Sequence, residues 1–168
     1  RYGDQLGISV LNERTGTIKH LSTAGGLSNK RVWALMEDNK GRIWVGTEEG
    51  VNVIDPKTDS VKYITKTQGL RGNDVYGPIF QDSRGRIWVG VFEKGIDLID
   101  EKTGTVKHIA PQHGLGNGLN ELIQDLSEDK SGRMWLGTWG GGVRMIDERA
   151  GRIKSLTTAQ GLGNDRII

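Results

Sequence analysis

The amino-acid sequence predicts an all-β protein built from repeated four-stranded units, and three observations lead to this fold class. A Trp-centred phrase, GRIWVGT at residues 41–47, returns as GRIWVGV at 85–91 and as GRMWLGT at 132–138. Short runs of β-forming residues alternate with Gly-containing turns, which is typical of strands joined by hairpins. No window shows the 3.6-residue period of an amphipathic helix.

The repeat is regular along the whole chain. Its central tryptophans, Trp44, Trp88 and Trp135, are 44 and 47 residues apart. Other landmarks shift in step with them. A Gly-Leu pair occurs at residues 26–27, 69–70, 114–115 and 161–162, and an apolar pair closing on Asp ends at residues 55, 100 and 147, with a degenerate copy (VLN) at 10–12. Several landmarks that drift together indicate a true internal repeat.

The unit at residues 28–68 shows how each strand is predicted. Residues 32–38 (VWALMED) follow the Gly-Leu pair and form the first strand. After an Asn-Lys-Gly turn, residues 42–46 (RIWVG) form the second, which is apolar on both faces, as in a strand covered on both sides. A Gly-containing loop precedes the third strand, 51–55 (VNVID), and a Pro-containing turn precedes the fourth, 60–65 (SVKYIT).

The first and last strands of each unit carry features of sheet edges. Pro78 falls in a first strand, which is tolerated where that strand is an edge. The fourth strands are polar and carry a lysine in register, which protects an outermost strand against pairing with other sheets. These lysines are Lys19, Lys62, Lys107 and Lys154.

Four antiparallel strands in a repeat of roughly 40–50 residues are typical of a β-propeller blade. We therefore expect Trp44, Trp88 and Trp135 to be buried between adjacent blades. The chain divides into a partial blade (1–27), three blades (28–68, 69–113 and 114–160) and the start of another (161–168). This is an incomplete arc of about 3.5–4 blades. We expect apolar faces at both of its ends, and hence a homo-oligomer or association with the remainder of a larger propeller.

Composition limits the possible partners. The 23 basic and 21 acidic residues are interspersed, so the sequence lacks the basic stripe of a nucleic-acid-binding surface. It has no run of 18 apolar residues, so we expect membrane attachment only through parts outside this chain. The absence of cysteine leaves no disulfide or thiol chemistry.

Residues 26–65, GLSNKRVWALMEDNKGRIWVGTEEGVNVIDPKTDSVKYIT, resemble the two-component regulator propeller repeat. The shared pattern is the Gly-Leu pair, the Glu-Asp turn, the WxGT phrase and the closing Asp, and it extends over essentially the whole chain. The resemblance implies a non-enzymatic sensor ectodomain of a hybrid two-component system that lies in the periplasm and recognises an oligosaccharide. The kinase, membrane helix and sandwich domain that accompany such propellers are not part of this sequence.

The histidines and turn aspartates, which are candidates for catalysis or metal binding, occupy positions that indicate structural roles. His20 and His108 share a repeat position with Tyr63 and Ser155, which indicates a surface position. The aspartate of each Glu-Asp or Gln-Asp turn is expected to cap its own turn through backbone N–H groups. These aspartates are Asp38, Asp82 and Asp129. We predict no catalytic residue, no metal site and no cofactor.

The positions at which the repeats differ indicate a ligand site. The loop between second and third strands holds aromatic residues in three repeats, and an asparagine recurs in the loop before each first strand. Both loops emerge on one face, where aromatic rings beside amide groups suit a sugar. The predicted ligand-binding residues are Tyr2, Asn29, Arg31, Glu48, Arg71, Asn73, Phe92, Asn120 and Trp139, and Asn164 continues the asparagine series. The asparagines also fit a purely structural role in turns.

Together these observations predict a ligand-sensing propeller segment whose small partner is an oligosaccharide or another small ligand. Two alternatives remain open at this point. One is a scaffold propeller whose rim binds another protein, such as the second subunit of a dimer. The other is a propeller enzyme, such as a polysaccharide lyase or a lactonase.

Overall fold

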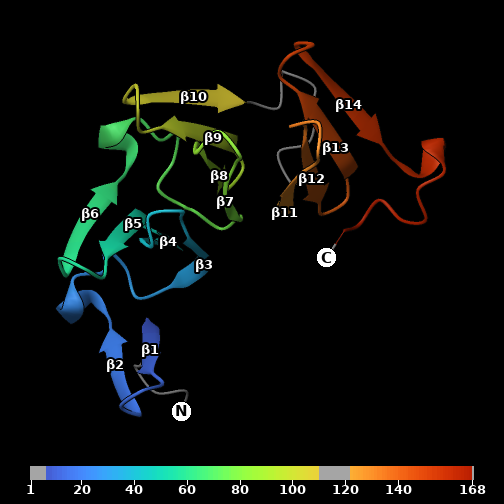
Figure 1. The fold of residues 1–168 in the computed structure, drawn as a ribbon. Coiled ribbons are helices and arrows are strands. Elements are labelled where there is room, and N and C mark those ends of the chain that lie inside the picture. The colour runs from blue at the N-terminus through green and yellow to red at the C-terminus, as the bar shows by residue number, and fades with distance from the viewer. Residues whose placement is uncertain (1–6, 110–121, 168) are drawn as a thin grey trace.

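Four antiparallel sheets follow one another along the chain in the computed structural model, which describes residues 7–109 and 122–167. The first sheet has two strands and each of the other three has four, paired in chain order. Figure 1 shows the sheets as an arc that runs from the blue hairpin to the red sheet without closing into a ring. The prediction of an all-β propeller arc is confirmed.

The strands have the following bounds. The hairpin pairs β1 (Ile8–Asn12) with β2 (Thr17–Leu21). The next sheet consists of β3 (Val32–Glu37), β4 (Ile43–Thr47), β5 (Gly50–Asp55) and β6 (Ser60–Ile64). The third consists of β7 (Ile79–Gln81), β8 (Ile87–Val91), β9 (Gly95–Asp100) and β10 (Thr105–Ile109). The last consists of β11 (Ile123–Glu128), β12 (Met134–Thr138), β13 (Gly142–Asp147) and β14 (Arg152–Leu156).

Helical structure in the described residues is limited to three short 3₁₀ turns. These are η1 (Thr23–Gly25), η2 (Lys66–Gln68) and η4 (Thr158–Gln160), each of which precedes a Gly in the left-handed conformation that leads into the next segment. Within the described ranges, no helix is long and apolar enough to cross a membrane.

The innermost and outermost strands are those that the sequence indicates. Along the inside of the arc, the first strand β7 contacts the first strands β3 and β11 of the sheets on either side. Pro78 directly precedes β7, an edge strand of its sheet. The fourth strands lie outermost, and their lysines are exposed to solvent: Lys19, Lys62, Lys107 and Lys154.

The repeated tryptophans form the contact between consecutive sheets. Trp44 is completely buried and packs with Leu70, Val75 and other apolar residues of the following sheet. Trp88 is also completely buried, in the cluster shared with the sheet β11–β14. The prediction that Trp135 is buried in the same way is wrong, since its side chain is only partly buried. In the described part of the chain no further sheet packs against that side of β11–β14.

Each turn aspartate caps its own turn, as predicted. Asp38 Oδ1 accepts hydrogen bonds from the backbone N–H groups of Lys40 and Arg42, at 2.9 Å each. Its other oxygen, Oδ2, accepts from the indole Nε1 of Trp44 at 2.9 Å and from Nε of Arg42 at 2.7 Å. Burial by itself raises the pKa of Asp38, but these donors outweigh it and lower the pKa from 3.8 to about 2.

The same arginine joins one sheet to the next. The guanidinium of Arg42 binds Glu101, the residue after β9 in the following sheet, with Nη1 3.0 Å from Oε1. Arg86 binds Glu148 after β13 in the same way. Arg133 occupies the equivalent position in the last sheet and binds its own Asp129 at 2.7 Å. The arginine is therefore a repeated inter-sheet contact, which sequence analysis did not identify.

Candidate functional site

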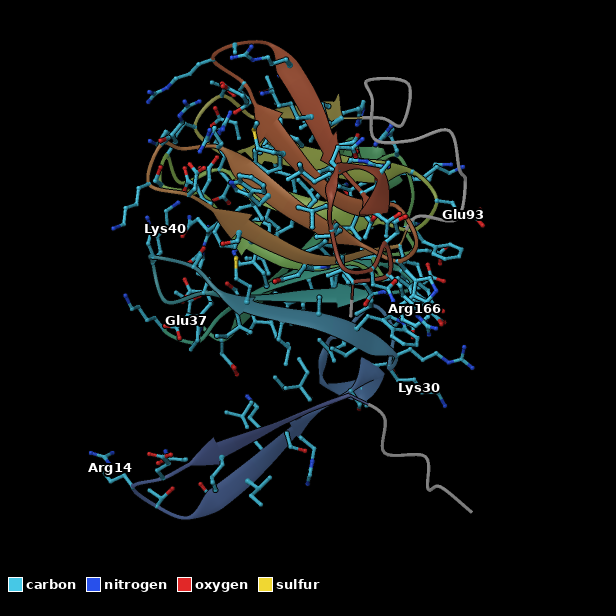
Figure 2. The ribbon with its side chains drawn as sticks, turned by 90° about the vertical axis from the view of Figure 1, so that its right-hand side faces the viewer. Arg14, Lys30, Glu37, Lys40, Glu93 and Arg166 are labelled. Atoms are coloured by element: carbon cyan, nitrogen blue, oxygen red, sulfur yellow. The ribbon has the colours of Figure 1, made fainter. Side chains whose placement is uncertain are left out.

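The loops before the first strands and the loops between second and third strands emerge on one face of the arc. Figure 2 shows Lys30, Glu93 and Arg166 on the same side of the molecule, with Glu37 and Lys40 on the opposite side. We call this side the loop face. It comprises residues 28–31, 47–50, 71–78, 91–95, 138–142 and 163–167.

An aromatic cluster lies on the loop face between two sheets. The ring centroids of Trp33 and Tyr76 are 4.2 Å apart with planes inclined by 26°, and those of Tyr76 and Phe92 are 5.2 Å apart at 44°. Trp33 belongs to β3, Tyr76 lies in the loop before β7, and Phe92 follows β8. Trp33 is 50% exposed. The cluster therefore presents a large aromatic surface to solvent.

A β-bulge accounts for the exposure of Trp33. The pairing of β3 with β4 shifts between Val32 and Ala34, so Trp33 has no partner in the register. A bulge residue is free to turn its side chain away from the pleat, and such bulges often occur beside functional sites. The equivalent residues of the other repeats are Gly77 and Gln124, so this ring is specific to one blade.

An ion pair borders the aromatic cluster. Nη1 of Arg31 lies 3.0 Å from Oε1 of Glu48, and the hydroxyl of Tyr76 donates to the same oxygen at 3.0 Å. The hydrogen bond from Arg31 lowers the pKa of Glu48, and the bond to Glu48 raises the pKa of Tyr76. At neutral pH the site therefore contains an ionised carboxylate, a guanidinium and a protonated phenol.

A second aromatic residue on the loop face is paired with a cation. The guanidinium of Arg166 lies 3.4 Å from the ring centroid of Trp139, a cation–π contact. Backbone N–H groups of Gly140 and Gly142 donate to the carbonyl of Asp165 and hold the two loops together. Trp139 is 37% exposed, so part of its ring is open to solvent although Arg166 covers one face.

Three of the residues proposed from the sequence are brought together. Arg31 and Glu48 bind each other, and Phe92 joins them through Tyr76. Trp139 forms the separate pair with Arg166. Tyr2 and Asn120 lie outside the described residues.

Of the remaining predicted residues, the two asparagines make contacts within their own loops. Oδ1 of Asn29 accepts from the backbone N–H of Arg31 at 2.8 Å, and Oδ1 of Asn73 accepts from that of Lys66 at 3.0 Å. These bonds agree with the structural alternative for the asparagines. The guanidinium of Arg71 binds the buried Asp97 of β9 at 3.1 Å. A ligand-binding role for these residues remains a prediction.

Trp33 and Tyr76 are not among the residues that the loop comparison predicts. Both lie where the repeats differ, because Trp33 corresponds to Gly77 and Gln124, and Tyr76 corresponds to Val32 and Ile123. Differences between the repeats therefore mark both residues in the first strands, as they mark Glu48 and Phe92 in the loops.

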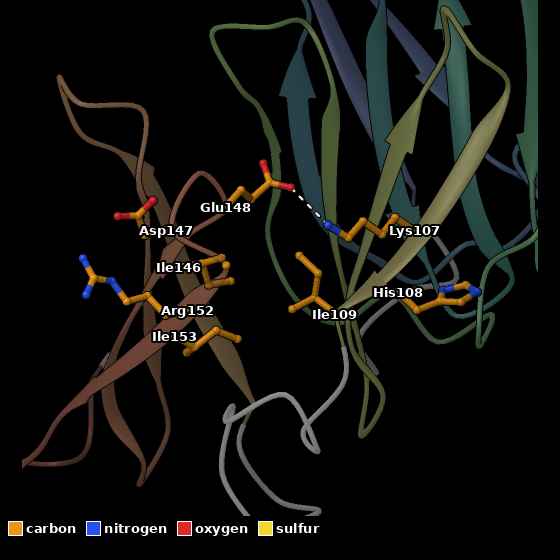
Figure 3. A pocket seen from close by; sticks show the side chains of 9 residues that line it. Lys107, His108, Ile109, Ile146, Asp147, Glu148, Arg152 and Ile153 are labelled. Atoms are coloured by element: carbon orange, nitrogen blue, oxygen red, sulfur yellow. Dashed lines mark hydrogen bonds and ion pairs between the residues drawn. The ribbon is translucent and has the colours of Figure 1, made fainter.

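Two grooves lie between neighbouring sheets on the outer side of the arc. The larger, about 260 Å³, is lined by Ile109, Ile146 and Ile153, and Lys107 binds Glu148 across it at 3.4 Å (Figure 3). A groove of about 220 Å³ lies between β6 and β9–β10, lined by the equivalent positions. Because shared repeat positions form both grooves, we interpret them as a product of sheet packing.

Away from the loop-face aromatic residues, the buried Asp97 binds both Arg71 and His108. His20 and His108 are exposed on outer strands, as expected from the repeat. In residues 7–109 and 122–167, no group of three His, Asp or Glu residues is placed to hold a metal ion.

Comparison with protein families gives one match, repeated along the chain. The family described as two component regulator propeller matches residues 26–49, 69–93 and 117–140. Each match begins near the Gly-Leu pair of a repeat and ends in the loop after its second strand. No curated protein matches the chain.

Solved structures of similar fold include extracellular domains of two component systems and a lyase. The extracellular domain of a hybrid two component system from B. thetaiotaomicron has a TM-score of 0.73 and 23% identity over 95% of this chain and 20% of that chain. Another such domain from the same organism has a TM-score of 0.72 and 23% identity, over 90% and 22%. A streptogramin B lyase has a TM-score of 0.69 and 16% identity, over 93% and 50%. The chain spans about a fifth of the length of the two extracellular domains, and at these identities the likeness concerns the fold.

Proposed function

Because the chain carries repeats of the two-component regulator propeller family, we propose that it is a ligand-sensing segment of an extracytoplasmic sensor domain. We propose the periplasm as its location and an oligosaccharide as its ligand. The ligand is proposed to bind on the loop face, at the aromatic cluster and at the separate Trp139.

The single observation that carries this proposal is the half-exposed ring of Trp33, stacked on Tyr76 and bordered by Arg31 and Glu48. An aromatic surface accepts the C–H face of a sugar ring, while a few polar groups at its edge bind the hydroxyls and fix the orientation. Burial of such a ring is a large term in binding energy.

The charge state of the site favours binding over catalysis. A general acid or base works best with a pKa near the operating pH. Here the pKa of Glu48 is lowered and that of Tyr76 is raised, so both move away from neutrality. We therefore propose that this site holds its ligand without transforming it.

The test is calorimetric titration of the purified protein with a panel of oligosaccharides. Trp33→Ala and Trp139→Ala should each weaken binding several-fold, since each removes roughly 1 kcal/mol or more of stacking. Both substitutions should leave the melting temperature nearly unchanged, because the rings are substantially exposed. Leu156→Ala, at an equally exposed position on the outer strand β14, is the control and should bind as the wild type does. Unchanged affinity in both Trp variants would remove the loop face as the site.

A protein-binding scaffold is the second candidate, and the hairpin β1–β2 is the observation that favours it. Val10, Leu11 and Ile18 are between 47% and 59% exposed there. Apolar residues grouped in this way often mark an interaction surface. Loss of a partner on replacement of these residues, with sugar binding absent, would support this function instead.

A further inference from the structure

The carboxylate of Glu48, at the polar side of the aromatic cluster, can accept further hydrogen bonds. Oε1 of Glu48 accepts from both Arg31 and Tyr76 at 3.0 Å. Oε2 of Glu48 lies 3.4 Å from Arg31, a long contact. A carboxylate accepts about four hydrogen bonds, so Oε2 can accept more. Groups that donate to such an oxygen include the hydroxyls of a sugar.

The positive charge at the site is already neutralised. Arg31 is the cation of the ion pair beside the cluster, and its charge is balanced by Glu48 at 3.0 Å. The wider loop face is balanced as well. Its described cations are Lys30, Arg31, Arg71, Lys94 and Arg166, and its described carboxylates are Glu48, Glu49, Asp74, Glu93 and Asp165. A surface of this kind does not produce the positive potential that attracts anionic ligands.

We infer that this site selects an uncharged saccharide, and that Glu48 excludes saccharides that carry a carboxylate or sulfate at the edge of the bound ring. The inference rests on the proposed function, because it presumes that a sugar stacks on Trp33. In this arrangement a hydroxyl of the sugar donates to Oε2 of Glu48. An anionic substituent in the same place would face an ionised carboxylate instead, and such like-charge contacts are an effective means of rejecting wrong ligands.

The position of Glu48 in the cluster makes it a specificity-determining residue. The hydroxyl of Tyr76 and the guanidinium of Arg31 hold the carboxylate in place beside the exposed ring. The lowered pKa of Glu48 keeps this carboxylate ionised under ordinary conditions. Glutamine in its place would keep an oxygen acceptor and remove the charge.

The test compares matched neutral and acidic probes. Manno-oligosaccharides are titrated against mannuronate oligosaccharides of the same linkage and length, within a wider panel of neutral, uronate and sulfated oligosaccharides. The wild type should bind the neutral member of a matched pair about tenfold more tightly, or better. Glu48→Gln should reduce this ratio to about threefold or less. Glu49→Gln removes the same charge from the same loop without touching the cluster, and should leave the ratio unchanged.

The possible failures are distinct. If an acidic saccharide is the tightest ligand and Trp33→Ala abolishes its binding, the inference is overturned while the proposed function stands. An unchanged ratio in Glu48→Gln, with the melting temperature preserved, also overturns it. If no saccharide of the panel binds, the proposed function and the inference fall together.

Discussion

The turn aspartates show how much structure one side chain organises. Asp38 binds two backbone N–H groups of its turn, the indole of Trp44 and the guanidinium of Arg42. Arg42 in turn reaches Glu101 in the following sheet. A single carboxylate thus connects a local turn to the core and, through one arginine, to the neighbouring blade.

This network predicts a loss of stability in acid. The pKa of Asp38 is about 2 in the folded chain against an ordinary 3.8, so the folded state favours the ionised form. Its contribution is complete above the unfolded pKa and is lost as the pH falls from about 4 to about 2. Urea denaturation across this range should show a steeper decline for the wild type than for Asp38→Asn. Part of the slope will remain, because the pKa values of Asp82 and Asp129 are also lowered. Parallel profiles for the two proteins would contradict the assignment.

The tryptophans differ in burial, and their replacement should differ in cost. Trp44 is fully buried, so Trp44→Ala should lower the free energy of unfolding by about 3–5 kcal/mol through lost contacts and the remaining cavity. Trp135→Ala should lower it by clearly less, because that ring is only partly buried. Chemical denaturation of the two variants measures both values. If both variants lost the same free energy of unfolding, the difference in burial between Trp44 and Trp135 would not explain their contributions to stability.

Among single residues, the shared repeat positions were the predictable ones. Trp44, Trp88 and the turn aspartates occupy one environment in each blade, so periodicity alone indicated their roles. Trp33 and Tyr76 were not predictable in this way. Their contact depends on a bulge in β3 and on the approach of the next sheet, and neither leaves a periodic trace.

At the scale of strands, a glycine in each second strand permits the close approach of a segment that leads into a first strand. A Cβ added to Gly90 would lie 2.8 Å from the Cα of Gly77, in the segment that leads into β7 of the same sheet. At Gly46 it would lie 2.8 Å from a methyl carbon of Val75. The WxG phrase is therefore constrained by its glycine as well as by its tryptophan.

Gly90→Ala should consequently destabilise the protein by about 1–3 kcal/mol, because backbone atoms of Gly77 must move to admit the methyl group. Gly163→Ala is the matched control. No atom lies within 4 Å of the position of its added Cβ, so its effect should stay within about 0.5 kcal/mol. Thermal and urea denaturation of both variants test the difference. If Gly90→Ala left the stability unchanged, the backbone before β7 would be able to move aside at little cost.

Strand order and position were predicted more accurately than strand length. The four strands expected from residues 32–65 appear as β3 to β6, with ends displaced by a residue or less. The first strand of the next blade is reduced to three residues, because Gly77 and Pro78 interrupt it. Inter-sheet pairs such as Arg42 with Glu101 join residues far apart in the sequence, and the repeat pattern does not pair them.

At the scale of the whole molecule, the arc leaves apolar residues uncovered. Leu11 is 58% and Ile18 is 59% exposed on the hairpin, whereas Ile54, the residue equivalent to Leu11, is 8% exposed in its four-stranded sheet. We predict that the 168-residue chain self-associates in solution. Light scattering should show a mass above that of a monomer, reduced by Leu11→Thr combined with Ile18→Thr. A well-dispersed monomer of the unaltered chain would contradict this expectation.

The joint between the hairpin and the sheet β3–β6 differs from the joints between the three sheets. Where the next two sheets carry Glu101 and Glu148, the sheet β3–β6 carries Pro56, which offers no carboxylate. The ion pair of Lys19 with Asp59, at 3.0 Å, is largely exposed and contributes little. In Figure 2 the hairpin extends away from the sheets, with Arg14 at its tip.

Local unfolding should therefore begin at this joint. The amide hydrogens of β1 and β2 are expected to exchange with deuterium through an opening that leaves the three larger sheets intact. The amides of β4, β8 and β12 should exchange only through a much costlier event, because tryptophan packing and the Arg–Glu contacts couple consecutive sheets. Hydrogen exchange followed at increasing denaturant would separate the two processes, and a single rate for hairpin and core would show that one opening governs the entire arc.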